Sequence, residues 1–360
     1  MAYTNIDDPS AFFQTVIWTG NSGSNVNVVN DGNSDLQPDF IWAKERTSPG
    51  GYDYNHNWVD SSRGVTKTLW CDSTAAEMTA SQSSYDLQSF NTDGFTTGAP
   101  EYTNSLGGSA VTDGKVAWQW KCNGGTTATN SDGSTDTTVQ ANTDAGFSIV
   151  TFTTDGGNET YGHGLGVKPD IVIVKSRSGG GSWIYMTDVI DGSVDYLLLN
   201  TTAASADLSY GAFTSSTFQY NDNNAVTQIA YCFASKQGYS KFGTYIGNAN
   251  ANGPFIYTGF KPAFVMAKIV PHANWNWAIM DNKRTPTNAN GTYEWIWADL
   301  ASAEFTDGDS GINMELDFLS NGFKIRTARN ELNYNGAKFV YMCFAEAPFV
   351  TSTGIPTTAR

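Results

Sequence analysis

The sequence predicts an all-β protein made of three related antiparallel β-sandwich units in tandem, of the jelly-roll or lectin-like type. Aromatic residues make up 13% of the 360 residues and there are 36 glycines, whereas only 15% of residues are charged. This composition is rich in strand and turn formers and poor in the residues of long helices. In addition, five short apolar blocks recur three times in one order. Such repetition predicts three related structural units.

The first block of each repeat begins with a proline and ends with a lysine. It occupies residues 38–44, 169–175 and 262–268. A proline suits the start of a strand, where a missing N–H removes no ladder bond. Residues 172–174 are apolar at successive positions, which indicates a strand that is buried on both faces.

The other blocks are also short, rich in aromatic and β-branched residues, and bounded by turn residues, as strands are. A tryptophan marks the second block, at residues 57–60, 182–185 and 276–279. The third block leads into a Ser, Thr or Ala segment, and the fourth, which unit two keeps only in part, contains phenylalanines. The closing strands, expected at residues 116–120, 229–233 and 340–344, carry bulky apolar residues on both faces. One of their faces is therefore expected to meet a neighbouring unit.

The blocks divide the chain into unit one at residues 1–122, a trimmed unit two at 146–236, and unit three at 237–360 with a C-terminal tail. Residues 123–145 are mainly Gly, Thr, Ser, Asn, Asp and Ala. This composition predicts a linker or an extended arm rather than a core element.

The charge balance restricts the classes of partner. The formal net charge is −15 and no basic cluster offsets it, which argues against binding of nucleic acid or of an acidic membrane surface. No run approaches the ~18 apolar residues of a membrane span, so we expect no membrane insertion. The first ten residues are polar and unlike a secretory signal, which favours assembly in the cytoplasm.

The cysteines are widely spaced and form no CxxC pair. Buried free thiols are therefore expected rather than disulfides or a zinc site at Cys71, Cys122, Cys232 and Cys343. The three histidines lie in different units, so we expect no shared metal site, and no cofactor.

Asp60-x-x-Arg63 and Asp281-x-x-Arg284 follow the tryptophan strands of units one and three. Arginine presents a planar donor fork that could clamp a ligand. A structural ion pair at the end of the strand is the favoured interpretation, because unit two has only Asp188 in a turn there and no arginine. A catalytic constellation is not expected to occur twice and be lost once.

Two glutamates and several loop aromatics are the remaining candidates. Glu77 and Glu304 could serve a glycosidase, but each follows a Ser/Thr-Ala segment that resembles a capped helical turn. We therefore assign no catalytic residue. Tyr52, Tyr54 and Trp275 are the candidate ligand-binding residues, because loop aromatics beside Asn and Asp can bind sugars.

Several longer motifs point to a known family. They include P-D-F-I-W-x-K at 38–44, G-H-G-L-G at 162–166, G-P-F-I-Y-T-G-F-K-P at 253–262, D-F-L-S-N-G-F-K at 317–324 and F-A-E-A-P-F at 344–349. In combination, over nearly the whole chain, they resemble a family of virion structural proteins of tailed bacteriophages, notably marine phages of cyanobacteria and related bacteria. The resemblance implies a virion component of the structural, tail or fibre kind that assembles with other virion proteins, and leaves its position on the particle open. It implies no defined catalytic residues.

Three functions remain open from the sequence. The first is a non-enzymatic tail or fibre adhesin that binds host surface glycans through loop aromatics, which is favoured because loop-rich β units commonly display variable contacts. The second is a purely architectural head decoration, collar or tail-surface protein. The third is a glycan depolymerase. The repeats also suit a homo-oligomer, a trimer in particular, on a threefold axis of the virion.

Overall fold

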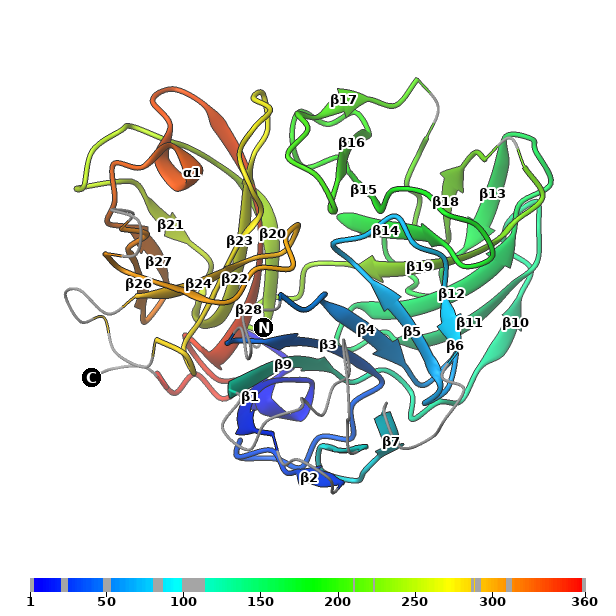
Figure 1. Ribbon diagram of the computed structural model, residues 1–360, viewed down its shortest axis with the longest axis horizontal. Helices are drawn as coiled ribbons and strands as arrows, with labels where there is room; N and C mark the ends of the chain where they lie inside the picture. The colour runs from blue at the N-terminus through cyan, green and yellow to red at the C-terminus, as the bar shows by residue number, and fades with distance from the viewer. Residues whose placement is uncertain are drawn as a thin grey trace.

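The computed structural model describes the chain except for residues 1–2, 21–24, 48–52, 80–86, 99–113, 210, 223, 286–287, 289–292, 309–312 and 358–360. The described residues form an all-β, sandwich-like fold with three large antiparallel sheets, each accompanied by a smaller sheet. The three sheet pairs surround a common centre (Figure 1). No helix in the described part of the chain is long and apolar enough to cross a bilayer.

Unit one follows a short 3-10 turn, η1 (Pro9–Ala11). Its large sheet has the spatial order β1 (Phe13–Thr19), β9 (Gly114–Trp120), β3 (Phe40–Glu45), β4 (Asn57–Asp60), β5 (Lys67–Trp70) and β6 (Met78–Thr79). Its small sheet has the order β2 (Val26–Val28), β8 (Phe95–Thr97) and β7 (Leu87–Phe90).

The large sheet of unit two has more strands than those of units one and three. The spatial order is β10 (Ala128–Asn130), β11 (Thr137–Asn142), β12 (Phe147–Thr153), β19 (Thr227–Phe233), β14 (Ile171–Ser176), β15 (Ile184–Thr187), β16 (Asp195–Leu198) and β17 (Ala206–Asp207). The small sheet contains only β13 (Glu159–Gly162) and β18 (Thr217–Tyr220) among the described residues, whereas those of units one and three have three strands each. The shortening of unit two is therefore seen in its small sheet.

The expected linker at residues 123–145 contains two strands of this sheet. β11 pairs with β12 along its length, and β10 pairs with β11. The buried side chains of Thr137 and Val139 alternate with the exposed Thr138. A polar segment thus forms strands here because β12 offers a complete edge for backbone hydrogen bonding.

Unit three repeats the plan of unit one. Its large sheet has the order β20 (Ser240–Ile246), β28 (Lys338–Pro348), β22 (Phe260–Ile269), β23 (Ala278–Asp281), β24 (Glu294–Trp297) and β25 (Phe305–Thr306). The small sheet has the order β21 (Phe255–Tyr257), β27 (Gly322–Ile325) and β26 (Leu316–Leu319), and α1 (Asn330–Asn333) is the one α-helix of the described residues. Pro262 lies inside β22 rather than before it, at a register shift against β28.

The strand registers make the three units equivalent about a central axis. In each closing strand, one aromatic residue lies opposite both neighbouring strands: Trp120 in β9, Phe233 in β19 and Phe344 in β28. These rings meet at the centre, with centroids 6.3 Å apart for Trp120–Phe233, 5.4 Å for Trp120–Phe344 and 6.0 Å for Phe233–Phe344. The chain therefore has a pseudo-threefold axis through this aromatic cluster.

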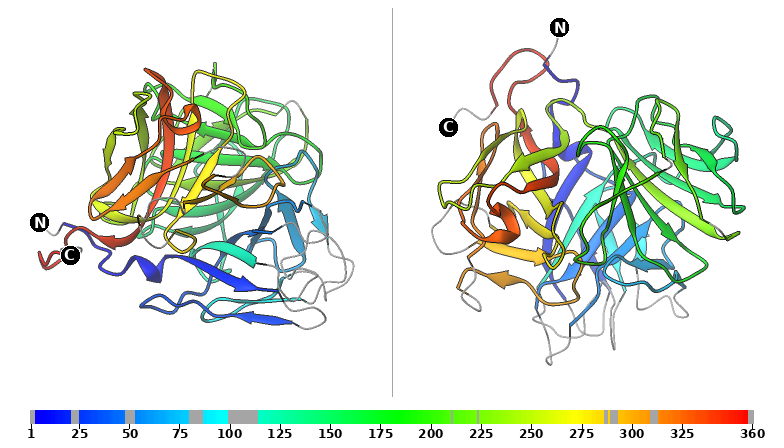
Figure 2. Two further views of the ribbon diagram at one scale, coloured as in Figure 1. Left: turned by 60° about the vertical axis from the view of Figure 1, so that its left-hand side comes forward. Right: turned by 90° about the horizontal axis from the view of Figure 1, so that it is seen from above.

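Each large sheet is buried on both faces. The inner faces of all three share one continuous hydrophobic core, and the outer face of each packs in its own sandwich core. The view from above shows the strands of unit three on the left and those of unit two on the right (Figure 2). The four cysteines are buried and free, as predicted.

The shared core makes a prediction about cooperativity. Phe344→Ala, at a residue that is 1% exposed, is expected to lower the free energy of unfolding by about 3–5 kcal/mol, because it leaves a cavity among three units. Urea unfolding followed by tryptophan fluorescence and by far-UV circular dichroism should give coincident transitions in the variant as in the parent. Transitions that do not coincide would contradict a shared core.

Candidate functional site

Side chains at equivalent positions bridge the three boundaries between units. In each case a ring nitrogen of one unit lies near a backbone carbonyl of the preceding unit in the ring. The three contacts are His56 Nε2 to Trp297 O at 3.0 Å, Trp183 Nε1 to Trp70 O at 2.8 Å and Trp277 Nε1 to Leu198 O at 3.0 Å. They form a closed cycle around the axis.

His56 takes the place of tryptophan in this cycle. Sequence matching aligns Trp58 with Trp183 and Trp277, but the strand register shifts that equivalence by two residues. His56 Nδ1 accepts a hydrogen bond from Trp42 Nε1 at 2.9 Å, so Nε2 carries the proton and donates to the carbonyl. Burial holds the pKa of His56 well below its usual value, which keeps the ring neutral.

The Asp60–Arg63 pair lies at the boundary between units one and two. Arg63 Nε lies 2.5 Å from Asp60 Oδ2, and its Nη1 lies 3.2 Å from Glu77 Oε2. Unit two contributes Arg177, whose Nε lies 2.8 Å from Glu77 Oε2, and Tyr231, whose hydroxyl donates to Asp60 Oδ2 at 2.7 Å. We call these five residues the first ion cluster.

The Asp281–Arg284 pair forms an equivalent second ion cluster at the boundary between units three and one. Arg284 Nε lies 2.6 Å from Asp281 Oδ2, and its Nη1 lies 3.0 Å from Glu304 Oε2. Unit one contributes Arg46, whose Nη2 lies 2.7 Å from Glu304 Oε1, and Trp118, whose Nε1 donates to Asp281 Oδ2 at 3.0 Å. Both predicted pairs thus extend into networks that join units.

The boundary between units two and three keeps the backbone contact but not the charges. Ser205 N donates to Val270 O at 2.9 Å, as Glu77 N does to Arg177 O and Glu304 N to Arg46 O. The strand registers and these contacts place uncharged residues at all five positions of the ion clusters, namely Thr187, Ile190, Ser205, Val270 and Met342. At this boundary all five residues of an ion cluster are thus replaced together by uncharged residues.

This geometry also bears on the two glutamates. Glu77 and Glu304 lie at different boundaries, and neither is in a helical turn. Burial acts to raise the pKa of Glu77, but the hydrogen bond from Arg177 and the charge of Arg63 outweigh it, so the pKa is lowered. A glycosidase acid requires the opposite shift. The sequence pattern that suggested a helix cap instead leads each glutamate into an ion cluster.

Three buried lysines, Lys44, Lys175 and Lys268, end the first block of each repeat. Burial lowers the pKa of each to about 8. Their ammonium groups donate to backbone carbonyls at Tyr54 and Ala301 for Lys44, at Gly181 and Thr74 for Lys175, and at Ile269 for Lys268. Lys44 and Lys175 thereby bridge to the preceding unit.

The structure places Tyr54 and Trp275, the two candidate aromatics that it describes, in different units. Tyr54 and Trp275 occupy equivalent positions, two residues before His56 and Trp277, and both are half-buried. Tyr54 lies at the boundary with unit three, whereas Trp275 packs against the core of unit three. Tyr52 lies outside the described residues.

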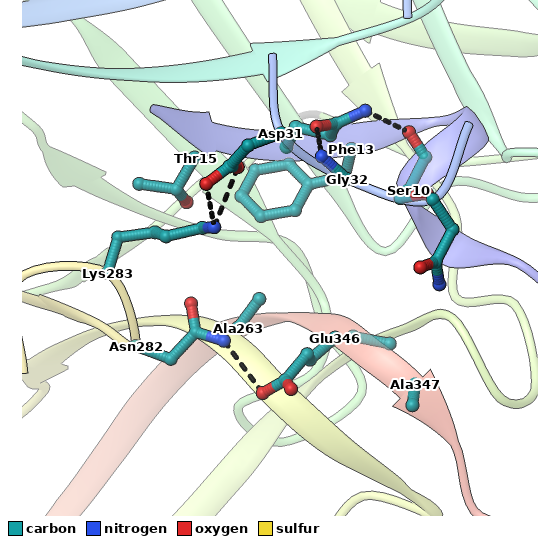
Figure 3. A pocket seen from close by; sticks show the side chains of 13 residues that line it. Ser10, Phe13, Thr15, Asp31, Gly32, Ala263, Asn282, Lys283, Glu346 and Ala347 are labelled. Atoms are coloured by element: carbon teal, nitrogen blue, oxygen red, sulfur yellow. Dashed lines mark hydrogen bonds and ion pairs between the residues drawn. The ribbon is translucent and has the colours of Figure 1, made fainter. Parts of the chain in front are cut away.

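A polar cleft between units one and three is the better candidate for a ligand (Figure 3). Its volume is about 270 Å³, close to the lower end for ligand pockets. Lys283 Nζ lies 2.7 Å from Asp31 Oδ1 on one side, and Asn282 Nδ2 donates to Glu346 Oε2 at 2.7 Å on the other. Phe13 lies in the wall. Sequence reasoning missed this cleft, because its walls come from distant segments.

The ion clusters predict a contrast between single and grouped substitutions. Arg63→Ile alone is expected to cost about 3–5 kcal/mol of unfolding free energy, because it leaves the buried Asp60 carboxylate without its partner. The grouped variant copies the third boundary, and most of the loss should be recovered in Asp60→Thr, Arg63→Ile, Glu77→Ser, Arg177→Val and Tyr231→Met combined. Urea denaturation measures the unfolding free energy of both variants. If the two variants were equally destabilised, the proposal that the five residues are replaced together would be refuted.

Lys268 predicts a pH dependence. Below pH 8 the amine is protonated in both states, and between about pH 8 and 10.4 only the unfolded chain keeps the proton, so this group makes stability rise with pH there. Lys268→Met should therefore stabilise the protein at pH 7, by about 1–3 kcal/mol, and give no gain near pH 10.5. Chemical denaturation at both pH values tests this, with the exposed Lys168→Met as the control. A gain that is independent of pH would contradict it.

Comparison with known proteins gives one match. The model of a family described as "Domain of unknown function (DUF7483)" matches residues 8–348, which is nearly the whole chain. No curated protein and no solved structure matches the chain.

Proposed function

The chain belongs to the DUF7483 family, and we propose that it is a non-enzymatic structural protein of a tailed-phage virion that contacts the host surface. The observation that carries the proposal is that the polar residues at equivalent positions of the units form contacts between units. The ion clusters and the cycle of ring nitrogens join units rather than line a reaction site. Such a construction favours a rigid display scaffold, and the motif resemblance to virion proteins supports the same role.

The cleft between units one and three supplies a contact site of suitable chemistry. Asp31 and Glu346 offer acceptors to hydroxyl groups, while Asn282 and Lys283 offer donors. Glu346 is exposed and Asn282 is half-buried, so a ligand can compete for their mutual hydrogen bond. A host surface glycan is the proposed ligand, because sugar hydroxyls both donate and accept. This replaces Tyr52, Tyr54 and Trp275 as the proposed contact residues.

A purely architectural role has one observation in its favour. Phe255 and Tyr257, on strand β21 at the edge of the small sheet of unit three, are 46% and 50% exposed. Residues two apart in a strand point to the same side, so the two rings form a pair that a neighbouring virion protein could cover. Homotrimer formation stays a prediction. The three units already supply a threefold arrangement within one chain, which would suit a trimeric neighbour.

Binding to host cells and to particles tests these roles. The purified protein should bind cells of its host, and Asn282→Ala combined with Glu346→Gln should reduce that binding at least tenfold, because the cleft loses a donor and a charged acceptor. Asp132→Asn removes an exposed charge in unit two and serves as the control. Phe255→Ser with Tyr257→Ser should leave cell binding intact but weaken binding to particles that lack the protein.

The alternatives give different results. Binding to particles without binding to cells or to their polysaccharide would favour the architectural role. Release of reducing ends from host polysaccharide would overturn the non-enzymatic assignment.

A further inference from the structure

Three carboxylates meet at the edge of the large sheet of unit two, beside unit three. Asp191 lies in the turn between β15 and β16, Asp195 begins β16, and Asp207 ends β17. One oxygen from each lies within 4.8 Å of the others. We propose that these three residues bind a Ca²⁺ ion.

The strongest support comes from Asp195. The residue is 3% exposed, and its Oδ2 has no hydrogen-bond partner among the described residues. A buried carboxylate without a partner is costly. Asp195 also lies directly opposite Asp207 in the antiparallel pair, an arrangement of like charges that destabilises a sheet. A cation between the two strands would remove both penalties.

The turn already orients the first ligand. Ser193 donates to Asp191 Oδ1 from its backbone N at 2.9 Å and from its Oγ at 2.6 Å. Gly192 has φ +102°, and its N donates to Asp188 O at 3.0 Å, which closes the turn. These contacts leave Asp191 Oδ2 available to a cation.

The local charge fits a divalent ion. Lys338 is the nearby positive group, and its Nζ donates to Ile190 O at 2.7 Å. Ionisation of all three carboxylates against one ammonium leaves two negative charges, which Ca²⁺ would neutralise.

Donor type and exposure favour calcium. The side-chain ligands are all carboxylate oxygens, which suit the hard cations Ca²⁺ and Mg²⁺. Ca²⁺ accepts irregular geometry and completes a shell of six to eight oxygens with water, whereas Mg²⁺ requires a near-octahedral one. Asp191 and Asp207 are exposed, so water has access to the remaining positions.

The position of the site suggests its use. Ile190, just before Asp191, occupies the position that Arg63 holds in the first ion cluster, and Ser205, two residues before Asp207, occupies that of Glu77. The calcium site therefore flanks the one boundary that lacks an ion cluster among the described residues. A bound ion would hold β16 and β17 together beside unit three.

Calcium titration of the full chain, after treatment with a chelator, tests the proposal. Isothermal titration calorimetry should show one site with a Kd on the order of 10⁻⁴ M, as for exposed extracellular calcium sites. Asp195→Asn should weaken binding at least tenfold, and so should Asp207→Asn, whose exposed position makes misfolding no concern. Asp188→Asn alters the same turn outside the cluster and should bind as the parent does.

Thermal unfolding gives an independent readout. Calcium should raise the Tm of the parent and of Asp188→Asn but not that of Asp195→Asn. Without calcium, Asp195→Asn should melt above the parent, because the repulsion with Asp207 is relieved. Absence of calcium binding in the parent, an equal effect of all three variants, or magnesium affinity equal to that for calcium would overturn the assignment.

Discussion

The contact among Trp120, Phe233 and Phe344 determines how the rest of the chain is arranged. Each large sheet is apolar on both faces, and the small sheet of its own unit covers only one of them. The other face can leave water only by packing against the large sheets of the other two units. No unit is therefore a complete domain by itself, and the closed ring follows from the burial requirement of its parts.

The polar groups that the boundaries bury beside this shared core need hydrogen-bond or ion-pair partners. The aspartates of the two ion clusters are fully buried, and each accepts from an arginine of its own unit and an aromatic residue of the next. Burial of unpaired charge is costly, whereas an apolar replacement of the whole set is tolerated. The third boundary, with Ile190 and Met342, is such a replacement. Because the boundaries differ, the other cyclic order of the units would place Arg46 opposite Ser205 and Glu77 opposite Val270, so that neither charge would have its partner.

The sequence was informative where the chemistry is local. The all-β class, the repeated strands and the two i,i+3 pairs follow from residues close together in the chain, such as Asp60 and Arg63. The partners of those pairs were not predictable, because Glu77, Arg177 and Tyr231 are brought together only by the packing of units. The strands at residues 123–145 were missed for a similar reason, since the edge of β12 rather than their own composition orders them. Likewise, Asp207 joins Asp191 and Asp195 through strand register alone.

The covalent connection of the three units has a consequence for how the surface can vary. In a homotrimer, a changed loop appears three times, and a harmful contact is multiplied with it. Here each substitution alters one facet of the ring, while the aromatic centre and the cycle from His56, Trp183 and Trp277 hold all facets in place. The cleft between units one and three differs from the other two boundaries, and so do the three carboxylates at the edge of the large sheet of unit two. One chain can thus carry three separately adjustable faces on a single threefold frame.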